Sequence, residues 1–143
     1  MVALASPASE IDIYIFDTLG ELGLVYRLAP IVFVGGSLVN HGGQNPIEAA
    51  KLGAAILHGP HVWNFGEIYT ALDASGGAEL VADVGKLTVR IGSWLKDADA
   101  RNKVAQTGLR AMETLAGALD RTVAALDPYL MQFRLEQRSD EGA

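Results

Sequence analysis

A glycine-rich segment that leads into a helix-start signal is the part of this sequence that most directly suggests chemistry. The segment reads Gly35-Gly36-Ser37-Leu38-Val39-Asn40-His41-Gly42-Gly43-Gln44-Asn45 and follows a short apolar run at residues 31–34, which is typical of a buried parallel strand. Glycines let the main chain approach a ligand closely, and the first N–H groups of a helix carry a partial positive charge. A strand, a glycine-rich loop and a helix N-terminus in this order predict a site for the phosphate of a nucleotide.

The helix after this loop begins at Asn45-Pro46-Ile47-Glu48. Asn45 is predicted to be the N-cap, Pro46 the first helical residue and Glu48 the third. From that position the Glu48 carboxylate could accept hydrogen bonds from ribose hydroxyls. A structural interpretation stays open, in which Glu48 completes a capping box and the glycines form a tight turn. The segment matches neither G-x-G-x-x-G nor G-x-x-x-x-G-K-[ST], so the standard phosphate-loop motifs do not decide between the two interpretations.

The elements that would position the loop alternate between strands and helices. Strands are predicted at residues 11–16, 31–34, 54–58 and 79–82, and short helices at 20–28, 46–52 and 64–74. This alternation indicates βαβ units and hence a Rossmann-like, three-layer α/β domain with a parallel sheet. From Asp83 onward the pattern is helical, with helices at 84–95, 98–126 and 129–137 and a break at Pro128.

Three loops follow predicted strands directly, at residues 17–21, 35–45 and 58–64. The carboxyl ends of parallel strands lie at one edge of a sheet, where the ligands of such folds bind, so the three loops are expected to gather there. Gly20 and Glu21 lie in the first loop, where main-chain amides could meet a phosphate or the edge of a cytosine. An ordinary surface turn is the alternative interpretation of these two residues.

The sequence gives less support to two other kinds of site, a nucleophilic serine and a metal centre. Ser37 is followed two residues later by Val39, where a nucleophile elbow needs its second glycine, so its hydroxyl is interpreted as a hydrogen-bond donor to a phosphate or a sugar. The three histidines are His41, His58 and His61. The last two flank a Gly-Pro turn that should direct their side chains apart, so no metal site is predicted. His41 lies within the glycine-rich segment and could help to hold a phosphate.

The composition excludes several classes of protein. The chain has 143 residues, of which 50% are hydrophobic, and it has no cysteine. It is therefore expected to form one domain with a substantial core, without disulfides or thiolate zinc sites, in agreement with a reducing cytoplasm. The net charge of -6 argues against nonspecific nucleic-acid binding and against a basic membrane-binding patch. No apolar run approaches the roughly 18 residues of a membrane span.

Three motifs, in this order, resemble one known family. They are Asp17-Thr18-Leu19-Gly20-Glu21-Leu22-Gly23, the segment from Val34 to Glu48, and Leu57-His58-Gly59-Pro60-His61-Val62-Trp63-Asn64-Phe65. Together they resemble the C-terminal domain of the 3-deoxy-D-manno-octulosonic acid (Kdo) transferases of Gram-negative bacteria. Those enzymes are GT-B-fold glycosyltransferases that transfer Kdo from CMP-Kdo to lipid A precursors. The resemblance runs from about residue 11 to residue 65, and the helical remainder fits it more loosely.

The resemblance implies that the chain is the donor-binding portion of such an enzyme, with CMP-Kdo as the donor substrate and no cofactor. The residues that would contact the nucleotide sugar are Gly20, Glu21, Gly35, Gly36, Ser37, His41, Gly43, Asn45 and Glu48. In this family the general base belongs to an N-terminal domain that is expected to precede these motifs. No catalytic residue and no metal ligand is therefore assigned, and the chain is expected to be inactive alone.

The resemblance also implies a domain organisation and a cellular setting. Residues 1–10 are expected to be a poorly ordered lead-in, residues 11–137 a partial Rossmann-like nucleotide-sugar-binding domain, and residues 138–143 a disordered tail. The full-length protein would be cytoplasmic, at the cytoplasmic face of the inner membrane. There the N-terminal domain would bind the lipid A precursor during lipopolysaccharide biosynthesis. An exposed interdomain surface is expected to support homo-oligomers.

Two alternatives to a Kdo transferase fragment stay open. One is a non-catalytic nucleotide-binding or assembly module, which would keep the fold without turnover. The other is a different GT-B protein, such as a UDP-sugar transferase or a nucleotide-sugar epimerase, since these share a glycine-rich loop and a glutamate for the ribose.

Overall fold

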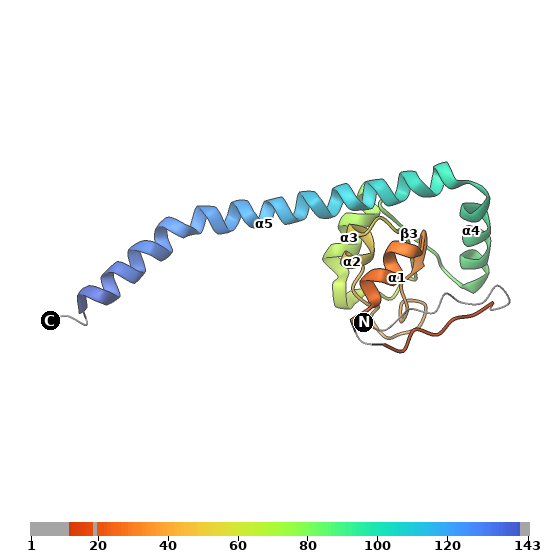
Figure 1. Ribbon diagram of the computed structural model, residues 1–143, viewed down its shortest axis with the longest axis horizontal. Coiled ribbons are helices and arrows are strands. Elements are labelled where there is room, and N and C mark those ends of the chain that lie inside the picture. The colour runs from red at the N-terminus through yellow and green to blue at the C-terminus, as the bar shows by residue number, and fades with distance from the viewer. Residues whose placement is uncertain (1–11, 19, 141–143) are drawn as a thin grey trace.

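The computed structural model describes residues 12–18 and 20–140 of the chain (Figure 1). In chain order the elements are α1 (Leu22–Leu28), β1 (Ile31–Phe33), α2 (Ile47–Lys51), β2 (Ala55–His58), a 3₁₀ turn η1 (Trp63–Phe65), α3 (Gly66–Ser75), β3 (Ala78–Leu80), α4 (Val84–Lys96) and α5 (Ala98–Asp140). Strands and helices alternate up to β3, as the sequence predicts.

The three strands form one parallel sheet in the order β1-β2-β3. Ile31 of β1 is aligned with Ala55 of β2, and Ile56 of β2 with Ala78 of β3. Every residue of the central strand β2 is buried, which agrees with its apolar sequence up to the final His58. The strands predicted at 31–34, 54–58 and 79–82 are all present, with ends that differ by one or two residues.

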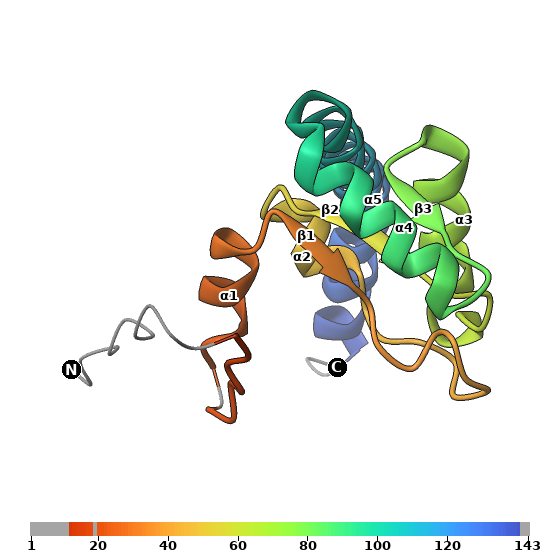
Figure 2. The same cartoon turned by 90° about the vertical axis from the view of Figure 1, so that its right-hand side faces the viewer.

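Helices lie on both sides of the sheet (Figure 2). Alternate residues of the strands face two hydrophobic clusters, one on each side of the sheet. Ile56 lies in the first cluster, together with side chains of α2, α3 and α5. Ala55 and Leu57 lie in the second, together with Trp94 of α4 and Ala105 of α5. Because β2 has helices packed against both of its faces, the predicted three-layer Rossmann-like α/β fold is confirmed.

Glycine and aspartate mark the ends of the helices that cover the sheet. Gly76 ends α3 in the left-handed conformation, with φ of 76°, which a residue without a Cβ adopts at low cost. Asp83 is the N-cap of α4, and its side chain accepts a hydrogen bond from the N–H of Lys86 at 2.8 Å. The helix predicted at residues 64–74 begins as the turn η1, and α3 starts at Gly66.

The last helix, α5, crosses the body of the domain and continues beyond it (Figure 1). The crossing is close at Gly108, where a Cβ built on Gly77 would lie 2.5 Å from the Gly108 Cα. Met112, one turn further along α5, is buried in the first cluster. With 43 residues at 1.5 Å each, α5 is about 65 Å long. Its outer part leaves Leu126 and Tyr129 exposed.

The helix break predicted at Pro128 is wrong, because α5 runs from Ala98 to Asp140 with Pro128 inside it. Proline removes one main-chain hydrogen bond and bends a helix, but good helix formers on both sides can carry the helix through it. The outer end of α5 is visibly curved in Figure 1. Residues 138–140, the first part of the predicted tail, belong to the same helix. Residues 141–143, like the predicted lead-in at 1–10, lie outside the described part of the chain.

The strand predicted at residues 11–16 is wrong for the part of it that the structure describes. Residues 12–18 form neither helix nor strand, and Ile13 and Ile15 are 81% and 80% exposed. The rings of Tyr14 and Phe16 pack on each other, with centroids 4.8 Å apart. The residue types suit a strand, but a strand needs a neighbour for its main-chain hydrogen bonds. In the described chain, the sheet begins at β1.

This exposed apolar segment and the outer part of α5 predict that the purified chain self-associates. Light scattering should show an average mass that rises with concentration. Replacing both Ile13 and Ile15 with lysine should lower that mass without lowering the melting temperature, because neither side chain is buried. A monomer at all concentrations would contradict the prediction.

Candidate functional site

The glycine loop, residues 35–45, leaves the end of β1 and returns to the start of α2. Gly36, Gly42 and Gly43 have φ angles of 70°, 98° and 73°. These values favour glycine, so the glycines are required by the conformation of the loop. The N–H of Gly43 donates to the carbonyl of Gly36 at 3.1 Å and closes the loop. A Cβ on Gly36 would lie 2.9 Å from the ring of His41, which places the exposed imidazole beside the first glycines.

Ser37 fastens the start of the loop to the turn that follows β2. Its buried hydroxyl donates to the carbonyl of Val34 and accepts a hydrogen bond from the N–H of Gly59 at 2.8 Å. Its carbonyl accepts from the N–H of His61 at 2.9 Å. The hydroxyl proton that the sequence assigns to a phosphate or sugar is therefore directed into the protein.

The approach between loop and turn is closest at Gly59. A Cβ at this position would collide with the carbonyl group of Ser37 and would lie 2.6 Å from the N of Leu38. Only glycine fits between these two segments without moving one of them. The second and third sequence motifs are therefore in direct contact at the carboxyl ends of β1 and β2, as predicted.

Asn64 is a functional candidate that the sequence motifs did not single out. Its side-chain amide donates to the carbonyls of His41 and Gly43, both at 3.3 Å, and its main-chain N–H donates to Gly42 at 3.1 Å. A Cβ on Gly42 would lie 2.5 Å from the Asn64 amide. Asn64 therefore holds the tip of the glycine loop. Its place at the same sheet edge was the signal that could have identified it.

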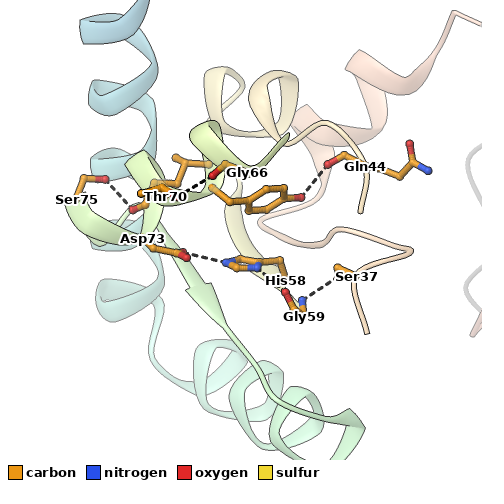
Figure 3. Close-up of polar contacts among 10 residues, drawn as sticks. Ser37, Gln44, His58, Gly59, Gly66, Thr70, Asp73 and Ser75 are labelled. Carbon is orange, nitrogen blue, oxygen red and sulfur yellow. Dashed lines mark hydrogen bonds and ion pairs between the residues drawn. The ribbon is translucent and has the colours of Figure 1, made fainter. Parts of the chain in front are cut away.

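Helix α3 supports the glycine loop from behind (Figure 3). The Tyr69 hydroxyl donates to the carbonyl of Gln44 at 2.8 Å. Burial raises the pKa of Tyr69 above its ordinary value, and Tyr26 and Asp73 raise it further, so the phenol remains a neutral donor. His58, at the end of β2, is buried and contacts Asp73 of α3. No local sequence pattern pairs these two residues, which are 15 positions apart.

The start of α2 agrees with the predicted signal to within one residue. The Asn45 side chain accepts a hydrogen bond from the N–H of Ile47 at 2.9 Å, although the helix itself is assigned from Ile47 with Pro46 in the cap position. Glu48 is exposed, and a Cβ on Gly23 of α1 would lie 2.9 Å from its Oε1. The carboxylate therefore lies against α1, rather than turning back to Asn45 as a capping box requires.

The remaining residues predicted to contact the nucleotide sugar are Gly35, Gly20 and Glu21. Gly35 is exposed at the start of the loop. Gly20 has φ of 88° and precedes α1, and the Glu21 side chain accepts a hydrogen bond from the Thr18 hydroxyl. Because α1 packs on α2, this first motif reaches the site through α1 and not through a strand of the sheet. The prediction that all three loops extend from strands of one sheet is therefore wrong for the first.

Glu48 of α2 lies close enough to Tyr26 of α1 to affect the pKa of its phenol. Burial raises the pKa of the Tyr26 phenol, and the nearby Glu48 carboxylate raises it further. Tyr26 also packs against the first hydrophobic cluster. Glu48 is thus an exposed carboxylate of α2 that lies against α1.

Two hollows of the described surface differ in their position relative to the predicted loops. One, of about 420 Å³, is lined by residues 63–68 and includes Asn64. Another, of about 470 Å³, lies between β3 and α4 beside Lys86 and Arg90, away from the glycine loop. The hydrogen bonds that organise residues 35–45 locate the candidate site more specifically than either hollow does.

Within residues 12–18 and 20–140, no three histidine, aspartate or glutamate side chains are grouped as ligands for a metal ion. None of the helices in these ranges combines the length and apolar character that crossing a membrane requires.

Comparison with known proteins gives a consistent family. No family model matches the chain. The 3-deoxy-D-manno-octulosonic acid transferase of Haemophilus influenzae is 34% identical over 125 residues, which cover 87% of this chain and 29% of that protein. The transferase of Bordetella pertussis is 37% identical over 126 residues, with the same two coverages. A probable mitochondrial 3-deoxy-D-manno-octulosonic acid transferase of Arabidopsis thaliana is 36% identical over 80 residues, 55% of this chain and 18% of that protein.

The chain therefore spans less than a third of the length of these curated relatives. Among solved structures, it is similar to the C-terminal CMP-Kdo binding domain of WaaA from Acinetobacter baumannii. The TM-score is 0.65 and the identity 26%, over 68% of this chain and 51% of that one. Sequence and fold together confirm the resemblance carried by the three motifs: this chain is a homologue of the C-terminal domain of the 3-deoxy-D-manno-octulosonic acid transferases.

Proposed function

We propose that this chain is the donor-binding portion of a Kdo transferase and that CMP-Kdo binds at the glycine loop. The observation that carries the proposal is the fastening of residues 35–45 at three points, by Ser37, Asn64 and Tyr69. A loop held in one conformation before the ligand arrives loses little entropy when it binds. The solved domain to which the chain is similar is described as binding CMP-Kdo.

The proposed contacts follow from the chemistry of the loop. Main-chain N–H groups around Gly36 would form a positively polarised nest for the phosphate of CMP. Gly43, whose own N–H closes the loop on the Gly36 carbonyl, would keep that nest in shape. His41, exposed beside Gly36, would add a donor to the same phosphate or to the Kdo carboxylate. Asn45 would keep the start of α2 in place, and Glu48 would accept hydrogen bonds from the ribose.

In the transfer reaction CMP is the leaving group, so negative charge develops on its phosphate as the bond to Kdo breaks. Oriented N–H groups at that point stabilise the transition state more than the ground state, which is how such a loop would accelerate the reaction. The acceptor hydroxyl must also lose a proton to a general base. We assign that base, the lipid A precursor and the association with the inner membrane to the part of the relatives that this chain does not span.

A binding experiment with paired variants tests the proposal. Calorimetry should show weak but measurable affinity for CMP, higher than for UMP or AMP. Glu48→Gln should weaken CMP binding about 5-fold or more, because a neutral amide accepts ribose hydrogen bonds less strongly than a carboxylate. Glu113→Gln, which changes an exposed carboxylate on α5, should leave the affinity unchanged.

Two outcomes of this experiment would contradict the proposal at different levels. Absence of CMP binding at millimolar concentration would exclude the donor-site function for this chain. If Glu48→Gln lowers the melting temperature and leaves the affinity unchanged, the site would stand, but Glu48 would have only a structural role at the start of α2.

A further inference from the structure

His58 is a fully buried histidine, and both of its ring nitrogens face oxygen atoms (Figure 3). Nδ1 lies 2.8 Å from the carbonyl oxygen of Gly59. Nε2 lies 2.9 Å from Oδ1 of Asp73 on α3. The proposed nucleotide contacts do not include this group, although it lies directly behind the turn that contacts the glycine loop.

The two contacts determine where protons must be on the ring. A carbonyl oxygen only accepts hydrogen bonds, and so does an ionised carboxylate. Both nitrogens of His58 must therefore carry hydrogen, which makes the ring an imidazolium. The Asp73 side chain is 39% exposed, which keeps its carboxylate in contact with water.

The surroundings of His58 suit a positive charge. The described titratable groups that face the ring are Asp73 and Tyr69, both on α3. The Tyr69 ring lies 4.5 Å from the His58 ring, centroid to centroid, at 49°. A buried charge is costly unless it is paired and hydrogen-bonded, and here a carboxylate, a carbonyl and an aromatic ring all contact it.

The His58 contact holds the carbonyl of Gly59, the residue whose N–H is bonded to the glycine loop. The Gly59 carbonyl accepts from His58, and the Gly59 N–H donates to the Ser37 hydroxyl at 2.8 Å. Ser37 in turn donates to Val34, at the end of β1. Helix α3 thus acts on both ends of the loop, through this relay at the beginning and through Tyr69 at Gln44.

We propose that His58, as an imidazolium paired with Asp73, is a positioning residue that fixes the Gly59–Ser37 contact and thereby the glycine loop. It touches neither the nucleotide nor the sugar in this proposal. The effect on ligand affinity rests on the proposed function, with CMP as the ligand, whereas the effect on the free protein does not.

The protonation state is tested by NMR on the full chain with ¹⁵N-labelled histidine, near neutral pH and without ligand. We expect two ring N–H signals from His58, assigned by their disappearance in His58→Phe. Asp73→Asn should leave one, because the asparagine amide can donate to a neutral Nε2 while Nδ1 keeps its proton for Gly59. A single ring N–H in the unmodified chain would overturn the imidazolium.

The positioning role is tested with three variants. His58→Phe keeps a buried ring but loses both hydrogen bonds, so the Gly59 amide should exchange faster with solvent and CMP affinity should fall about 5- to 10-fold. His58→Asn places its side-chain amide near the position of Nδ1 and should restore most of that affinity. Asp73→Asn preserves the Gly59 contact and should change CMP affinity by no more than about 2-fold.

A purely structural role for His58 predicts a different order. His58→Asn leaves a cavity and should melt at a lower temperature than His58→Phe. If CMP affinity simply followed stability, His58→Phe would therefore bind CMP more tightly than His58→Asn, which is the reverse of the order expected here. Unchanged Gly59 exchange in His58→Phe would overturn the proposal, as would CMP affinity equal to that of the unmodified chain.

If His58→Phe does not fold, His58→Asn and Asp73→Asn still give both measurements. If the unmodified chain binds no CMP, the donor-site proposal fails, while amide exchange and ring protons still decide the role of His58.

Discussion

Replacing Gly59 with alanine is expected to abolish CMP binding and to lower the free energy of unfolding by about 3 kcal/mol. The added Cβ would collide with the Ser37 carbonyl group and lie 2.6 Å from the N of Leu38. Neither atom can move freely, because Ser37 is hydrogen-bonded on both sides and the loop is held again at Asn64. The glycine loop would therefore separate from the turn after β2, and the nest of N–H groups would lose its shape. Chemical denaturation and calorimetry with CMP measure the two effects.

A second glycine provides the matched control. Gly92 lies in α4, and a Cβ there would have no atom within 4 Å. Gly92→Ala should therefore raise the free energy of unfolding by up to about 1 kcal/mol, since alanine favours a helix interior over glycine. CMP affinity should be unchanged. If Gly59→Ala behaves like Gly92→Ala, the close approach of the two motifs does not organise the site.

Much of the fold could be predicted from local sequence. The strands of the sheet are short apolar runs, and the loop between β1 and α2 has glycines where the main chain adopts positive φ angles. Asn45 accepts from the N–H two residues later, as its predicted capping position requires. These features depend on main-chain sterics and on hydrogen bonds within a few residues, so the local pattern contains the necessary information.

The features that could not be predicted depend on contacts between distant parts of the chain. His58 and Asp73 are 15 residues apart, and Asn64 is 23 residues from its partner His41. Nothing in the local pattern shows that a histidine at the end of a buried strand will meet a carboxylate on the following helix. The same reasoning applies to residues 12–16, which have the composition of a strand but no neighbouring strand in the described chain. A strand prediction from composition cannot test whether that partner exists.

Pro128 illustrates a different limit. Its cost to a helix is local, about 3 kcal/mol for an interior position, and this led to the predicted break. Whether a helix stops there depends on what continues it on both sides. In α5 the flanking residues favour the helix and the proline is accommodated within it. The free-energy cost of the proline is correct, but whether the helix continues through it depends on the stability of the whole helix.

The second large effect is expected in the transfer reaction itself. The purified chain should transfer no Kdo from CMP-Kdo to a lipid A precursor, even at concentrations at which it binds CMP. A general base must come within hydrogen-bond reach of the acceptor hydroxyl, on the side of the sugar opposite the leaving phosphate. In the proposed arrangement, the described acidic and histidine side chains around the glycine loop do not meet that requirement. His58 is buried against Asp73, and Glu48 and His41 would lie with the loop on the donor side.

Mixing the chain with a separately expressed N-terminal part of a related transferase is the informative contrast. If this chain supplies the donor site, activity should appear only in the mixture and should fall strongly with Gly59→Ala, which alters the loop but no candidate base. The variants Asp17→Asn and Glu21→Gln decide the opposite case, because these carboxylates are the remaining candidates near the first motif. Turnover by the chain alone that either variant abolishes would place the base within residues 17–21. The assignment of this chain as a donor-binding portion without its own base would then be wrong, because donor site and base would lie in the same domain.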